Sequence, residues 1–411
     1  MSKTAQELLE ERKKRVLDAV ALKVPDRVPM YVPCCAVGAE WAGITVKEGF
    51  TDMARWADIN EKLMLEFEPD MFIGLYAFDI ESNEMVGTKN YNWPGNGLPD
   101  TSSAQFHEGE YMKAEEYDAF IDNPGDFIFR KYLPRVYGKL EGLNYMPPFM
   151  SLLSYGGLFQ GFSNPAVLDS LQTIINAAKC SFNNFMHVIS FTSRMVNHGF
   201  PALIGFGSHA PFDVISDYLR GLKGSSLDLF RCPEKILAVQ EKLMPYLIES
   251  SVSFGKMMGT PITFIALHRG SDEFMSLKQF DKFYWPGLKK LLLAVIDEGQ
   301  IPLVFWEGMW DQRLEYLREL PKGKVLGWFD RTDIFEAKKV IGDNMCILGN
   351  MPISLLQTGT PETVRAYAKK LIDVVGEGGG FIMAPNTQID NGRKELVKVW
   401  VDFTREYGIY K

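Results

Sequence analysis

The stretch Ala202–Gly221 reads ALIGFGSHAPFDVISDYLRG. Its apolar first part predicts a buried strand, Gly207–Pro211 predict a short polar turn, and the remainder predicts a helix that carries Tyr218. In such a βα unit, side chains at the turn face whatever binds at the carboxyl end of the strand. His209 and Tyr218 are therefore the first candidate site residues. Taken alone, a helix-capping histidine and a core tyrosine would explain them equally well.

The same order of apolar strand, polar turn and helix recurs along the chain. Helices with clear starts, such as those from Thr332 and from Thr360, separate the later strands. Eight strands alternating with helices predict an α/β protein built as a (β/α)8 TIM barrel, whose polar strand ends meet at one mouth. The other seven predicted strands are Val28–Pro33, Asp70–Tyr76, Pro261–Leu267, Ile301–Phe305, Val325–Phe329, Met345–Leu348 and Gly380–Met383.

Two segments lie outside this repeating pattern. Residues 1–24 carry apolar side chains at helical spacing among charges and predict an N-terminal helical extension. Between about residues 88 and 160 the pattern loosens into turn signals, which indicates an insertion after the second strand, over the barrel mouth. The whole chain, residues 1–411, is expected to form a single domain. Aromatic residues of the insertion can line a substrate cavity or pack the insertion on itself: Tyr91, Trp93, Phe106, Tyr132 and Tyr137.

Composition excludes several classes of function. The net charge is −8 and no block rich in lysine and arginine is present, so we expect no nucleic-acid partner. The charged N-terminus lacks the apolar core of a secretory signal, and no apolar run is long enough to span a membrane. We therefore expect a cytoplasmic protein without a membrane partner. The five cysteines lack metal-type spacing and are expected to be reduced thiols.

Polar side chains follow most of the predicted strands. Asp79 comes after the second strand, where a carboxylate is costly to bury unless it has a function or a partner, although helix capping is the competing explanation. His268 and Glu307 follow the fourth and fifth strands in the same way. Asp330, Asn350 and Asn386 follow the last three strands and are candidates for substrate binding, as is His209.

Four stretches resemble consecutive motifs of the uroporphyrinogen decarboxylase superfamily. That family includes the decarboxylase and the methyltransferases that move methyl groups to or from a corrinoid cofactor. The resemblance covers most of the chain from about residue 200 onward and, more loosely, residues 25–87. The stretches are ALIGFGSHAPFDVISDYLRG (202–221), LHRGSDEFMSLKQFDKFYWPGLKKL (267–291), VLGWFDRTDIFEAKKVIGDNMCILGNMP (325–352) and GTPETVRAYAKKLIDVVGEGGGFIMAPN (359–386).

The resemblance to the decarboxylase itself is incomplete at the residues that bind its substrate. Asp79 and Tyr218 match the aspartate after the second strand and the tyrosine of the βα helix. The first loop, Cys34–Gly38, lacks the arginine of the decarboxylase, and the last strand ends in Asn386–Gln388 without its histidine. A substrate with eight carboxylates would find few fixed cations here, so uroporphyrinogen decarboxylation is not expected.

Zinc-dependent methyltransferases of the family carry a His-x-Cys motif after the fifth strand and a further cysteine after the last. The corresponding residues here are Phe305–Glu307, and the last loop has no cysteine, so zinc bound by thiolates is not supported. Glu307 takes the place of a ligand cysteine and can pair with His268. Together with His209 or Asp330, these residues would supply oxygen and nitrogen ligands, so a zinc site of this kind stays open.

The remaining chemistry fits removal of a methyl group from oxygen, nitrogen or sulfur. A methyl group that leaves a phenyl ether for cobalt(I) deposits negative charge on the oxygen, so the enzyme must supply a proton or a Lewis acid and an apolar pocket. We expect a corrinoid-dependent methyltransferase of the O-demethylase type, acting on a small methylated compound and foremost on a methoxylated aromatic. The expected catalytic residues are Glu307, His268, Tyr218 and Asp79, with Trp306, Trp310 and Trp328 as walls for the ring.

The corrinoid is expected to come from a partner. The chain has no Asp-x-His-x-x-Gly cobalamin-binding motif, so a separate corrinoid protein would dock over the mouth. Barrels that this chain resembles are commonly dimeric, which leaves a homodimer open. Two other functions also stay open: a decarboxylase of a smaller aromatic or pyrrolic acid that uses Asp79 and Tyr218, and a catalytically silent binding barrel.

Overall fold

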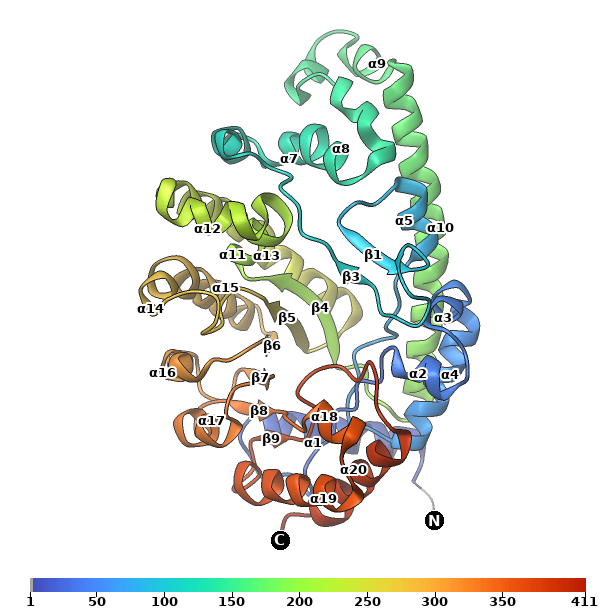
Figure 1. Cartoon of the computed structure of the whole chain (residues 1–411), viewed down its shortest axis with the longest axis vertical. Helices are drawn as coiled ribbons and strands as arrows, with labels where there is room; N and C mark the ends of the chain where they lie inside the picture. The colour runs from blue at the N-terminus through green and yellow to red at the C-terminus, as the bar shows by residue number, and fades with distance from the viewer. Residues whose placement is uncertain (1–2) are drawn as a thin grey trace.

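The computed structural model describes residues 3–411, and its centre is a six-stranded parallel sheet (Figure 1). The strands neighbour one another in sequence order from β4 to β9, as successive βα units require. They confirm six of the predicted strands. Their bounds are β4 (Ile204–His209), β5 (Ile262–Leu267), β6 (Ile301–Trp306), β7 (Leu326–Phe329), β8 (Cys346–Leu348) and β9 (Phe381–Ile382).

The first two predicted strands are present only as single parallel bridges. Met30 pairs with Met383, and Tyr31 pairs with Met71, so both segments continue the order of the sheet beyond β9. Two of the six residues in the first predicted strand are prolines, which have no N–H to donate to a neighbouring strand. In the second predicted strand, Gly74 interrupts the extended backbone with a φ of 52°. Across residues 3–411 no backbone pairing joins the second segment to β4, so the closed ring of eight strands is not seen.

Side chains from all eight predicted strand segments nevertheless meet in one apolar cluster. The N-terminal helix α1 (Ala5–Val20) also packs on this cluster through Val16, Ala19 and Val20, which confirms the predicted helical extension. Alternate residues of the same strands face a larger core beneath the outer helices, as expected for strands buried on both sides. Members of the inner cluster are Tyr31, Met71, Leu203, Ile204, Ile262, Leu303, Leu326, Trp328, Cys346, Leu348 and Ile382.

A buried ion cluster fastens α1 to the start of the sheet. Asp70 is fully buried and accepts hydrogen bonds from Arg15 at 2.7 Å and from Arg27 at 2.7 Å. The backbone N–H of Met30 donates to the same carboxylate at 2.8 Å. A buried carboxylate with this many donors is compensated for its lost hydration, and removing it would take the buried partner from both arginines, although Arg15 keeps its contacts with Asp26 and Glu11.

The outer helices begin where the sequence predicts. Ser276 and Gln279 form a capping box, and Thr360 caps its helix in the same way. The helix expected from Thr332 begins at Ile334, with Asp333 as its cap. The helices are α11 (Pro211–Asp213), α12 (Gly221–Arg231), α13 (Pro233–Met258), α14 (Leu277–Gln279), α15 (Trp285–Asp297), α16 (Leu314–Leu317), α17 (Ile334–Ile341), α18 (Ile353–Thr358), α19 (Pro361–Lys370) and α20 (Lys394–Tyr407).

One long helix, α10 (Pro165–Asn197), runs along a whole side of the molecule (Figure 1). Asn164 caps it and Pro165 occupies its first turn, as predicted. It packs against helices of the N-terminal half, mainly α5 and α4. Across the described chain, no helix combines the length and the apolar character needed to cross a membrane. The N-terminal helices are α2 (Val37–Trp41), α3 (Val46–Thr51), α4 (Met53–Phe67) and α5 (Ile80–Val86).

The predicted insertion forms a small sheet followed by short helices. Its strands are ordered β2-β1-β3. The backbone N–H groups of Tyr111 and Met112 both donate to the carbonyl of Leu219, at 2.9 and 2.7 Å, so the insertion is fastened beside the segment that follows β4. Its elements are β1 (Tyr91–Pro94), β2 (Gly97–Leu98), β3 (Gln105–Phe106), η1 (Ala114–Glu116), α6 (Tyr117–Asp122), α7 (Pro124–Phe127), η2 (Ile128–Tyr132), α8 (Leu133–Val136), η3 (Gly138–Tyr145), η4 (Phe149–Leu153) and α9 (Gly157–Phe162).

Candidate functional site

The segment after β4 brings the first two predicted site residues together. The pairing of β4 with β5 is irregular between Phe206 and His209, and such a bulge re-aims the side chain that follows it. Tyr218 lies on the π-helix η5 (Val214–Arg220), a type of helix that is frequent at functional sites. The Tyr218 hydroxyl is 3.0 Å from Nε2 of His209.

His268 lies beside this pair and is held by a buried carboxylate. Its Nδ1 is 2.6 Å from Oδ2 of Asp217, whose side chain is only 3% exposed. Burial by itself would lower the pKa of His268, but the hydrogen bond with Asp217 and the charge of Asp213 offset that effect and raise the pKa to about 9. His268 is therefore an imidazolium at neutral pH, with its Nε2–H directed away from Asp217.

Glu307 faces the free side of the imidazolium. Its Oε2 lies 3.9 Å from Nε2 of His268, and 49% of its side chain is exposed. Gly308 turns the chain directly after it with a φ of 80°. Partial burial raises the pKa of Glu307, although the nearby imidazolium lowers it. We name the group made by His209, Asp217, Tyr218, His268 and Glu307 the His268 cluster.

His209 stands in the opposite charge state to His268. Burial, together with the positive charge of His268, lowers the pKa of His209 to about 4, so its ring is neutral at pH 7. The two imidazole rings are 5.3 Å apart between centroids. In a neutral imidazole one nitrogen carries the proton and the other accepts, so the Tyr218 hydroxyl is the donor in the tautomer that has its proton on Nδ1 of His209.

Two aspartates of the site were not found by sequence reasoning. Asp213 is fully buried and accepts hydrogen bonds from the Tyr284 hydroxyl at 2.8 Å and from the backbone N–H of His268 at 2.9 Å. It fixes the loop after β5, while Asp217 fixes the ring of His268. Their spacing of four residues on the buried face of the helix after β4 was a signal that could have identified both.

The three polar residues after the last strands form a network beside Glu307. Asn386 donates to Asp330 at 2.9 Å, and Asp330 accepts the backbone N–H of Gly308 at 3.1 Å. Asn350 is 7% exposed and accepts from the Tyr367 hydroxyl at 3.2 Å. Most of their hydrogen-bonding groups are thus engaged in holding the loops around Glu307.

The three tryptophans predicted as walls for a substrate ring lie below the surface. Trp306 and Trp310 are fully buried in the outer core between sheet and helices, and the indole N–H of Trp310 donates to the carbonyl of Glu307 at 2.9 Å. Trp328 faces the inner cluster, is 2% exposed and donates to the carbonyl of Pro385 at 2.8 Å. Trp306 is directed away from the inner cluster because odd positions of β6 face inward and Trp306 is at an even one. Contact of these three side chains with a substrate stays a prediction.

Asp79 caps a helix. Its carboxylate accepts the backbone N–H of Ser82 at 3.1 Å, at the start of α5, and the side-chain amide of Asn184 in α10 at 2.9 Å. In the described chain its hydrogen bonds do not reach the His268 cluster. The sequence allowed either helix capping or a catalytic role for Asp79. The structure shows the helix-capping contacts.

The donor atoms near Glu307 do not fit the zinc site that the sequence left open. Nδ1 of His268 is occupied by Asp217, Nε2 of His209 by Tyr218, and both oxygens of Asp330 by other groups. Between residues 3 and 411, no group of three or more His, Cys, Asp or Glu side chains is arranged to hold a metal ion. Two ligands, Glu307 and His268, fall short of the four that zinc ordinarily takes.

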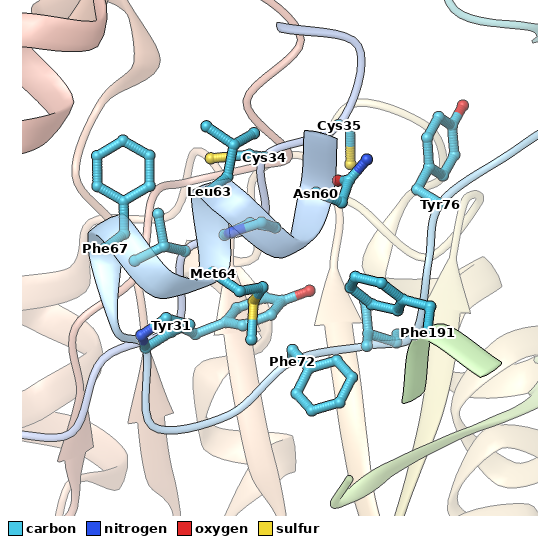
Figure 2. Close-up of a pocket in the computed structure, with 15 residues that line it drawn as sticks. Tyr31, Cys34, Cys35, Asn60, Leu63, Met64, Phe67, Phe72, Tyr76 and Phe191 are labelled. Atoms are coloured by element: carbon cyan, nitrogen blue, oxygen red, sulfur yellow. The ribbon is translucent and has the colours of Figure 1, made fainter. Parts of the chain in front are cut away.

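A separate small cavity of about 50 Å³ lies beneath α4 (Figure 2). Tyr31, Leu63 and Phe72 contribute to its mostly apolar lining, together with Cys34 and Cys35. Burial raises the pKa of Cys34 to about 12 and raises that of Cys35 as well. Both thiols stay protonated, and the space admits only a few water molecules, so this cavity does not fit an aromatic ring.

Comparisons with known proteins agree with the arrangement of the sheet. A solved structure described as a methyltransferase from Methanosarcina mazei has a TM-score of 0.61 and 17% sequence identity, over 96% of this chain and 98% of that one. At this identity the likeness concerns the fold. The curated proteins that were compared give no significant match. The model of the family Uroporphyrinogen decarboxylase (URO-D) matches residues 160–407, which is more than half of the sequence, and the chain therefore belongs to that family.

Proposed function

We propose that this protein is a methyltransferase of the O-demethylase type, which takes a methyl group from a small methoxylated aromatic compound and passes it to a corrinoid on a separate protein. The observation that carries the proposal is the His268 imidazolium, held by buried Asp217 and facing Glu307 across 3.9 Å. Membership of the URO-D family and the likeness to the Methanosarcina methyltransferase structure support it. The closed eight-stranded barrel belongs to the same proposal.

The chemical need is a proton at the oxygen that loses the methyl group. The partner's reduced corrinoid supplies the nucleophile that accepts the methyl group. As the carbon–oxygen bond breaks, its electron pair stays on the oxygen, and Nε2–H of His268 donates a proton to that oxygen, so that a neutral phenol leaves. General acid help of this kind is worth about 10²- to 10⁴-fold in rate.

The neighbours of His268 have distinct tasks in this step. Asp217 keeps the ring charged and oriented before the reaction. Glu307, whose pKa is raised by partial burial, lies on the solvent side and returns a proton to the neutral imidazole after each turnover. Tyr218 and neutral His209 form a polar wall beside the leaving oxygen. No step is assigned to zinc, because the donor set does not fit it. Corrinoid-protein docking at the mouth and a homodimer remain predictions.

The proposal is tested by mixing the purified protein with a reduced corrinoid protein and a panel of methoxylated aromatics, methylamines and thioethers. Loss of the cobalt(I) absorbance with a methoxylated aromatic, and its slowing by at least about tenfold in His268→Gln, is the expected result. His198→Gln is the matched control, because His198 lies on the surface against Glu61. Absence of methyl transfer from every donor, or full activity in His268→Gln, would overturn the proposal.

The same imidazolium also favours a second candidate, the decarboxylase of a small aromatic or pyrrolic acid. Loss of carbon dioxide leaves a carbanion that must take up a proton, and His268 could donate it. Release of carbon dioxide from such acids without any corrinoid protein would support this candidate over methyl transfer.

A further inference from the structure

The insertion places three half-buried tyrosines over the His268 cluster. Tyr91 is on β1, Tyr132 ends η2, and Tyr137 directly follows α8. The backbone brings two of them together: Thr88 pairs antiparallel with Tyr137, and β1 starts only three residues after Thr88. These segments are far apart in the sequence from His268.

Edge-on ring contacts connect these tyrosines to the site. The ring of Tyr91 lies 5.2 Å from that of Phe106, and Phe106 lies 5.4 Å from Tyr218, measured between centroids. On the other side, Tyr132 contacts Tyr111 at 6.0 Å, and the backbone of Tyr111 is bonded to the residue after Tyr218. The tyrosines of the insertion and Tyr218 therefore belong to one group of neighbouring aromatic side chains.

The hydroxyls of these residues are unused donors. Within residues 3–411, Tyr91, Tyr132 and Tyr137 make no side-chain hydrogen bond, and Tyr218 bonds only to His209. Burial raises the pKa of all four phenols, and Tyr91 adds to the effect on Tyr218. The hydroxyls of Tyr91, Tyr132 and Tyr137 keep their protons at neutral pH, so each is free to donate a hydrogen bond to an acceptor on a ligand.

We propose that Tyr91, Tyr132 and Tyr137 form a subsite for a neutral oxygen on the ring of the methyl donor, other than the oxygen that loses the methyl group. A phenolic hydroxyl and a second ether oxygen share this chemistry. The inference rests on the proposed function and names its substrate class more closely. A carboxylate on the methyl donor would need an unpaired cation in the protein. The nearby guanidinium of Arg269 is instead paired with Glu108 and Asp217.

Binding to the intact protein without any corrinoid tests the subsite directly. Calorimetry with 2-methoxyphenol, methoxybenzene and 4-methoxybenzoate would be compared for wild type, Tyr91→Phe, Tyr137→Phe and the double variant. We expect each single change to weaken binding of 2-methoxyphenol by about 2- to 10-fold, the loss of one neutral hydrogen bond, and to leave methoxybenzene unaffected. Tyr145→Phe is the matched control, since this tyrosine of the same insertion is 67% exposed.

Each other result overturns the subsite. Unchanged affinity for 2-methoxyphenol in the double variant, with the melting temperature of the wild type, would show that the hydroxyls do not bind the donor. A larger loss for 4-methoxybenzoate would replace the neutral oxygen by a carboxylate. Failure of the wild type to bind any of the three ligands would also overturn it. The methyl-transfer assay with His268→Gln is separate, so the proposed function can survive when the subsite fails.

Discussion

Replacing Asp217 by asparagine removes the carboxylate that keeps His268 charged. The pKa of His268 is about 9 in the folded protein, compared with 6.5 for an ordinary histidine. Without the Asp217 carboxylate, His268 loses both a hydrogen bond and a neighbouring charge that raise its pKa. The charges of Asp213 and Glu307 still raise the pKa, and desolvation, the largest single influence, lowers it. At pH 7.5, a pKa that falls from about 9 to about 6.5 reduces the imidazolium fraction about tenfold. We therefore expect Asp217→Asn to slow methyl transfer at least about tenfold at this pH.

The titration of His268 can be followed directly by nuclear magnetic resonance. The chain has only five histidines, and the spectrum of His268→Gln assigns the signal. A wild-type midpoint near 6.5, or a midpoint in Asp217→Asn that stays near 9, would refute the reasoning. The rate profile supplies a second reading, because the descending limb should move toward lower pH in the variant.

The same shift has a consequence for stability. Since the pKa of His268 is higher in the folded than in the unfolded chain, its contribution is fully present below about pH 6.5 and is lost as the pH rises through about 9. Chemical denaturation at several pH values measures this loss. In Asp217→Asn the pH dependence between these limits should become flatter.

Three further predictions concern single carboxylates. Glu307→Gln should lower turnover by at least about tenfold in the methyl-transfer assay without changing the melting temperature, because the carboxyl that returns the proton is lost. Asp79→Ala should lower the free energy of unfolding by about 1 kcal/mol, since α5 loses its cap, whereas Asp79→Asn should keep most of it. Asp70→Asn should cost about 3 to 5 kcal/mol in denaturant unfolding, because Arg15 and Arg27 lose a buried partner.

Each of these has an outcome that contradicts it. Wild-type turnover in Glu307→Gln would remove that residue from the mechanism. Loss of methyl transfer in Asp79→Ala with unchanged stability would give Asp79 the catalytic role that its position after the second strand suggests. Asp26 also contacts Arg15 but its side chain is 58% exposed, so an equal loss in Asp26→Asn would show that burial is not the cause.

The sequence by itself determined the parallel α/β architecture. Apolar runs of strand length, each closed by a polar turn and a capped helix, locate β4 to β9 and the starts of α10, α14 and α19, because these features depend on neighbouring residues. The same local signal overestimated the first two strands, where prolines and Gly74 limit pairing to single bridges. It also identified His209, Tyr218, His268 and Glu307 as side chains at strand ends.

Only the tertiary structure decided what these side chains do. Asp217 holds His268 across 51 residues, and the pKa values of His209 and His268 move in opposite directions because one ring is buried beside a cation and the other beside two carboxylates. Trp306 is likewise fully buried, in the core between the sheet and the outer helices. Charge state and exposure depend on neighbours that are remote in sequence, so local pattern places a residue at the site but does not give its chemistry.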